Sequence, residues 1–139
     1  MQIQRIQTLW LILALGCMVA FIVLPFATLD IPGTGMAEMY PYTFYGLIIP
    51  AGLAALFMLL AVFGYKNLKA QRSEIVLALM MTLVAVGITA YLIFDRASVG
   101  VIEWRWTVVF PVAALVFTIL AIAGVNRDMK LLRSYDRLR

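Results

Sequence analysis

The chain of 139 residues is too apolar to fold as a water-soluble domain. Its residues are 65% apolar and 13% charged, and its mean hydropathy is +1.01. A soluble domain carries about 25% charged residues, and half that share does not cover a water-exposed surface of this size. The net charge of +4 comes from short basic stretches between long neutral ones, which is typical of membrane-protein loops and not of a nucleic-acid-binding protein. We therefore expect a single integral-membrane domain over residues 1–139.

Four long segments without Asp, Glu, Lys or Arg follow one another along the chain. Each has about 20 residues or more, which is the length of a helix that crosses a hydrocarbon layer of about 30 Å. The connections are short, so neighbouring helices should be antiparallel. The predicted fold is an all-α membrane protein, an antiparallel bundle of four transmembrane helices with a C-terminal amphipathic cytoplasmic helix. The predicted spans are residues 7–26, 42–65, 75–94 and 106–125, followed by a cytoplasmic tail of residues 126–139.

The first span begins like an export signal, and Leu15-Gly16-Cys17 resembles a lipoprotein cleavage box. Residues 18–24 remain apolar beyond this box, where a mature lipoprotein would become polar. We therefore expect a retained helix in which Cys17 is a packing residue.

Turn signals separate the spans. Pro32, Gly33 and Gly35 predict a turning loop after the first span. Ser73 is a candidate N-cap for the third span. Pro50 and Pro111 lie within the second and fourth spans, where we expect Pro50 to bend its helix and Pro111 to lie near the start of its helix.

The basic residues predict the orientation. Nine Lys and Arg side chains fall before the first span, between the second and third spans, or in the tail, whereas Arg96 and Arg105 are the two on the other side. This bias places both termini in the cytoplasm.

Candidate chemistry is sparse. The chain has no histidine and one cysteine, and its spans hold no ionisable Asp, Glu, Lys or Arg, so we expect no enzyme activity, no metal site and no cofactor. Thr82, Thr89 and Thr118 are expected to bond to backbone carbonyls, of their own helix or of a neighbouring one, although they could instead line a path for a solute. Small residues permit close helix approach, either within the bundle or to a partner, and the candidates are Gly16, Ala20, Ala51, Gly52 and Ala55.

The tail carries the most informative polar residues. As a helix it would place Leu131, Tyr135 and Leu138 on one face and basic residues over the rest of its surface. Such a segment suits anionic phospholipid at the cytoplasmic face, or an acidic protein partner, better than nucleic acid. The candidate docking residues are Lys130, Arg133, Tyr135, Asp136, Arg137, Leu138 and Arg139.

Three segments carry a family resemblance. The opening residues 4–10, the middle residues 66–71 and the closing residues 128–139, above all the final Arg-Ser-Tyr-Asp-Arg-Leu-Arg, resemble domain of unknown function 4293, a family of small bacterial inner-membrane proteins. The chain departs from the family pattern just before Lys130, where it has Arg127-Asp128-Met129 in place of further charged residues. The resemblance implies four helices and a bacterial inner membrane, and it implies no activity.

Two functions remain open from the sequence. The leading hypothesis is a structural or accessory subunit that associates with a membrane protein assembly or with itself. The alternative is a small permease or channel component, which rests on the two prolines and the threonines.

Overall fold

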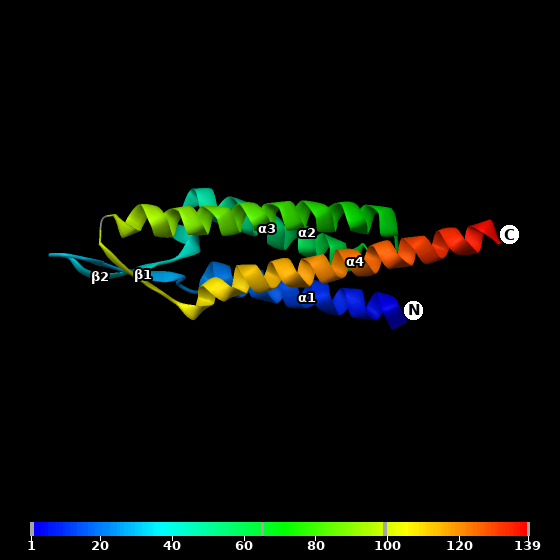
Figure 1. Ribbon diagram of the computed structural model, residues 1–139, viewed down its shortest axis with the longest axis horizontal. Helices are drawn as coiled ribbons and strands as arrows, with labels where there is room; N and C mark the ends of the chain where they lie inside the picture. The colour runs from blue at the N-terminus through cyan, green and yellow to red at the C-terminus, as the bar shows by residue number, and fades with distance from the viewer. Residues whose placement is uncertain (1, 65, 99, 139) are drawn as a thin grey trace.

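The computed structural model describes residues 2–64, 66–98 and 100–138. Within these residues, four helices are long and apolar enough to cross a membrane. They are α1 (Gln2–Val23), α2 (Tyr45–Phe63), α3 (Leu68–Ala97) and α4 (Val109–Arg137). They lie side by side in an elongated bundle with the N- and C-termini at one end (Figure 1), which we call the terminal end.

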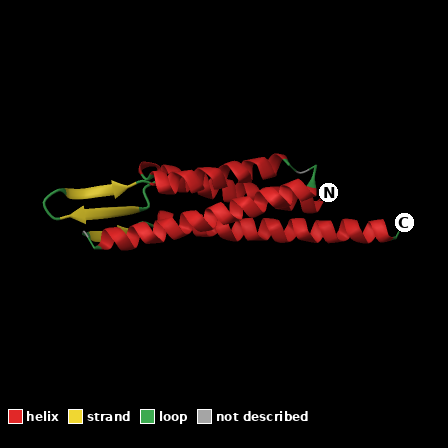
Figure 2. Cartoon of the chain, turned by 90° about the horizontal axis from the view of Figure 1, so that it is seen from above, coloured by secondary structure: helices red, strands yellow, loops and turns green. Residues whose placement is uncertain are grey.

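A three-stranded antiparallel sheet lies at the opposite end, which we call the sheet end. It consists of β1 (Ala27–Ile31), β2 (Gly35–Met39) and β3 (Val101–Trp104) in the order β2-β1-β3. The hairpin of β1 and β2 projects beyond the helices (Figure 2). The prediction of an all-α protein was therefore wrong in this region, because segments interpreted as turning loops pair as strands.

Local sequence explains the hairpin. Gly33 and Gly35 have φ angles of +94° and +85°, a conformation that glycine adopts at no steric cost, and they allow the tight turn between β1 and β2. Along β1, Ala27 and Leu29 are buried whereas Thr28 and Asp30 are more exposed, which is the period of two expected for a strand with one covered face.

Two helix boundaries differ from the predicted spans by more than the others do. α3 begins at Leu68 rather than after Ser73, because Asn67 is its N-cap and accepts a hydrogen bond from the Ala70 N–H at 3.4 Å. α4 continues to Arg137, so the residues predicted as a separate tail prolong the fourth helix. Pro111 is in the first turn of α4, as predicted, where its missing N–H breaks no helical hydrogen bond.

Each helix buries a series of residues spaced by three or four, and α2 buries Pro50 in addition to its series. In α3 the buried side chains are those of Gln71, Ile75, Ala78, Thr82, Ala85, Thr89 and Ile93. Alanine recurs on the buried side of every helix, whereas large apolar side chains such as Phe63 and Phe94 are 72% and 78% exposed. Larger side chains such as Leu11, Met18 and Phe21 are also fully buried, so the interior combines small and bulky residues. Small residues at recurring buried positions are typical of helices that approach each other closely in lipid.

Candidate functional site

A buried polar pair joins α1 to α4 at the terminal end. Gln7 Nε2 donates a hydrogen bond to Asp128 Oδ2 over 2.6 Å, and the two residues are 2% and 9% exposed. The sequence interpretation missed this pair because it assigned Asp128 to an exposed tail. A signal was available, since Asp128 continues the spacing of three and four residues set by the buried Thr118, Ala121 and Val125.

Gly124 makes room for this pair. A Cβ atom at Gly124 would lie 2.8 Å from Gln7 Cγ and 3.2 Å from Gln7 Nε2. Any side chain there would therefore require the Gln7 side chain to shift. The glycine thus allows α1 and α4 to approach closely enough for the hydrogen bond.

The other polar residues buried in the helices are also bonded within the protein, whereas Glu74 Oε2 and Arg96 Nε, buried atoms of two half-buried residues of α3, have no hydrogen-bond partner among the described residues. Thr82, Thr89 and Thr118 each donate to the carbonyl four residues earlier, at 2.6 to 2.8 Å, which confirms the predicted bonding to backbone carbonyls and shows that the carbonyls are those of their own helices. Gln71 Nε2 donates to the Ala61 carbonyl at 3.0 Å and so links α3 to the last turn of α2. These bonds satisfy polar side chains that would otherwise be costly to bury.

Basic side chains from two parts of the chain converge beside the buried pair. Two shallow hollows separate the start of α3 and the turn before it from the C-terminal part of α4. One is lined by Arg72, Asn126, Met129, Lys130 and Arg133, and the other by Lys66, Asn67, Leu68, Lys69, Met129, Leu132, Arg133 and Asp136. We call the two hollows together the basic groove.

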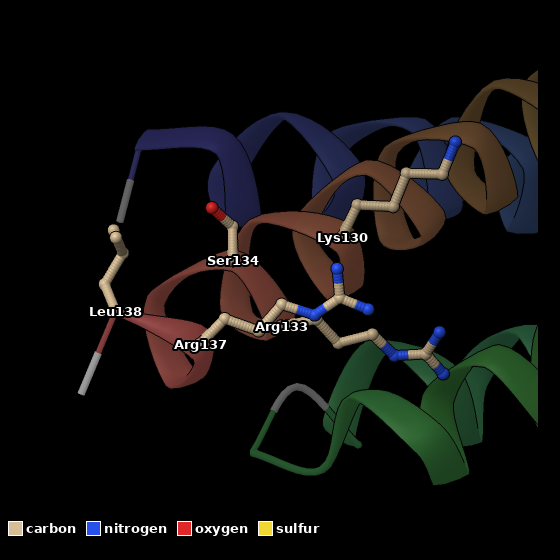
Figure 3. A pocket seen from close by; sticks show the side chains of 5 residues that line it. All are labelled: Lys130, Arg133, Ser134, Arg137 and Leu138. Atoms are coloured by element: carbon tan, nitrogen blue, oxygen red, sulfur yellow. The ribbon is translucent and has the colours of Figure 1, made fainter.

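The last turns of α4 continue this basic surface. A neighbouring hollow is lined by Lys130, Arg133, Ser134, Arg137 and Leu138. In Figure 3 the Lys130, Arg133 and Arg137 side chains extend back along α4, toward the bundle. This direction follows from helix geometry, because side chains of a helix lean toward its N-terminus.

The cations of the groove lack partners in the described part of the chain. None of Lys66, Lys69, Arg72, Lys130 and Arg133 forms an ion pair or a side-chain hydrogen bond with another described residue. Asp136 is the one carboxylate among the described residues that line the groove. The groove therefore has a strongly positive potential that favours an anion.

The candidate docking residues of the tail lie together on the end of α4. Lys130, Arg133, Tyr135, Asp136, Arg137 and Leu138 are all exposed, and Arg139 lies outside the described residues. Tyr135 and Leu138 are 68% and 82% exposed, so their apolar surface is not covered by the described chain.

The candidate packing residues are distributed over different surfaces. Ala51 is buried in the core, whereas Ala20, Gly52 and Ala55 are half-buried. Gly16 is exposed, and no atom lies within 4 Å of the position that its Cβ would take. The pair Gly16 and Ala20 therefore does not provide a close contact between described helices.

The sheet end carries a separate polar cluster. Arg105 Nη2 and Glu38 Oε1 form an ion pair at 2.9 Å, and the Tyr40 hydroxyl donates to Glu38 Oε2 at 2.6 Å. The hydrogen bond to the Glu38 carboxylate raises the pKa of Tyr40, because a tyrosinate would lose that bond and face a negative charge. The three residues connect β2 to the segment after β3, and exposed ion pairs of this kind contribute little to stability.

Four candidate membrane helices, a small sheet at one end and a basic groove at the other define a helical protein with the length and hydrophobicity to cross a membrane repeatedly. Residues 3–138 match the family described as Domain of unknown function (DUF4293), so the chain belongs to this family. This match confirms the family expected from the opening, middle and closing segments. No curated protein matches the chain.

The buried pair generates a prediction about stability. Asp128→Ala should lower the free energy of unfolding by about 1–3 kcal/mol, because the buried Gln7 amide loses its acceptor. Asp128→Asn keeps an acceptor oxygen for the Gln7 amide, so it should lower the free energy of unfolding less than Asp128→Ala does. The measurement is reversible unfolding in mixed detergent micelles, with the exposed Asp136→Ala as the matched control. Equal stability of Asp128→Ala and Asp136→Ala would show that the pair does not hold α1 against α4.

Proposed function

We propose that this protein is a non-enzymatic, structural or accessory subunit of a membrane protein assembly in the bacterial inner membrane. The observation that carries the proposal is a contrast between the two parts of the bundle. Polar side chains in the core hydrogen-bond within the protein, whereas the end of α4 leaves basic and apolar side chains uncovered. A core whose buried polar residues are already hydrogen-bonded, together with a terminal end whose basic and apolar side chains are exposed, suits a protein that binds other proteins.

In the proposed arrangement the four helices form an antiparallel bundle across the bilayer. Exposed aromatic side chains near the sheet end, such as Tyr45, Tyr91 and Trp106, support a membrane interface there. The basic terminal end supports a cytoplasmic placement of both termini, with the sheet on the other side. The end of α4 is then an amphipathic cytoplasmic helix that presents Tyr135, Arg137 and Leu138 to a partner.

A small permease or channel component is the second candidate. Pro50 lies inside α2 and has no N–H to donate to the Gly46 carbonyl, so backbone that could bind a solute is freed at this turn. Against this, the hydroxyls of Thr82, Thr89 and Thr118 already donate within their own helices. The accessory role therefore has more support.

Site-directed labelling tests the orientation. In a Cys17→Ala background, a cysteine introduced at the exposed Gly33 or Ser98 should react with a membrane-impermeant thiol reagent in intact spheroplasts, because both positions lie on the sheet side. A cysteine at Asn67 should react only after the membrane is opened. Labelling of Asn67→Cys in intact spheroplasts, with none of Gly33→Cys, would reverse the proposed topology.

A matched charge reversal tests the docking role of α4. Arg137→Glu should remove most of the protein recovered with this chain in mild detergent, because it places a negative charge where an acidic partner is proposed to bind. Arg127→Glu changes the net charge equally at an exposed position of the same helix that lines none of the three hollows described above, and it should leave recovery nearly unchanged. Equal recovery with both variants, while both remain in the membrane, would argue against docking at this end.

A further inference from the structure

The basic groove combines charged side chains from two separate elements with apolar lining residues. Lys66 and Lys69 come from the turn before α3 and from its first residues, whereas Lys130 and Arg133 come from α4. Among the described residues, these ammonium and guanidinium groups have no carboxylate within ion-pair distance. Asp136 lines the groove as well, so among the described residues five lining cations face one carboxylate. Holding this excess of positive charge together is unfavourable, so an anion between the two elements would stabilise the arrangement.

The hollow that Lys66 and Lys69 line also has apolar lining residues, which a simple inorganic anion would not contact. Leu68, Met129 and Leu132 line it together with the cations. Leu132 is 53% exposed, so part of this apolar surface faces outward. A ligand with a phosphate and an attached apolar body matches both components, whereas free phosphate matches the charge alone.

The position of the groove along α3 fits the level of lipid headgroups. Arg72 lines the groove, and the exposed apolar surface of α3 begins one turn later with Val76 and Leu77. In a bilayer the phosphates lie just outside the hydrocarbon that such apolar surface contacts. The Lys130 and Arg133 side chains extend back toward that level (Figure 3).

We propose that the basic groove is a defined binding site for the phosphate of an acidic phospholipid in the cytoplasmic leaflet. Arg72 and Arg133 contact the phosphate from opposite sides, while Leu68, Met129 and Leu132 contact the glycerol and the start of the acyl chains. The proposal rests on the membrane orientation proposed above. It differs from general attraction to a charged surface because it requires particular cations in a fixed arrangement, with one lipid bound per groove.

Native mass spectrometry of the full chain in detergent tests the site, with phosphatidylglycerol or phosphatidylcholine added. Wild type should retain phosphatidylglycerol in preference to phosphatidylcholine. Arg133→Gln and Arg72→Gln should each weaken retention about fivefold, the value expected for one basic group at an anionic headgroup. Arg127→Gln removes the same charge from a part of α4 that does not line the groove, and it should weaken retention less than about twofold if the site is local.

Three results would overturn the proposal. Equal weakening by Arg127→Gln and Arg133→Gln would indicate attraction that depends on net charge alone. Displacement of the lipid by inorganic phosphate at millimolar concentration would assign the groove to a soluble anion. Equal retention of phosphatidylglycerol and phosphatidylcholine would show that headgroup charge does not determine binding. Partner recovery depends on Arg137 in the proposed function, so loss of lipid preference with intact recovery would count against the lipid site alone.

Discussion

Close packing of small residues is the constraint on which the rest of this fold depends. Because bulky apolar side chains cover the outside of the helices, the hydrophobic effect alone does not determine which face turns inward in lipid. The faces that meet carry Ala14 in α1, Ala51 and Ala54 in α2, Ala78 in α3 and Ala114 in α4, all fully buried. Backbones can approach closely along such faces, and van der Waals contact then holds the helices together.

Polar contacts fix the two ends of the pair formed by α1 and α4. At the sheet end, the Thr107 hydroxyl donates to the Pro25 carbonyl at 2.6 Å, which ties the segment just before α4 to the segment just after α1. At the terminal end, Gln7 and Asp128 form the corresponding link. Asp128 faces α1 while its neighbour Met129 lines the basic groove, so the buried pair also determines how the groove cations on α4 are presented.

The sequence predicted the four apolar helices because uninterrupted length is a local property. It did not predict the sheet, since β1, β2 and β3 are short and two of them pair across more than sixty residues of intervening chain. The buried faces were also hard to predict, because helices that are apolar on all sides show little amphipathic pattern. A subtler signal existed in α3, where Gln71, Thr82 and Thr89 share the spacing of the buried alanines. The candidate docking residues were chosen from charge and periodicity, and their role stays a prediction. No signal in the sequence indicated that Lys66, Lys69 and Arg72 lie beside α4, because only the tertiary structure brings these residues together.

Accessibility of spin labels along α3 tests the central claim of a packed, inert interior most directly. Labels at residues 76 to 90 in bilayers should be reached by molecular oxygen at outward positions such as Leu77 and Val84, and by neither oxygen nor a water-soluble nickel complex at Ala78 and Ala85. The resulting pattern should repeat with the spacing of the buried residues of α3. Access of the nickel complex to labels at Thr82 and Thr89 would instead reveal a water-filled passage, and it would contradict the proposed accessory role in favour of a permease.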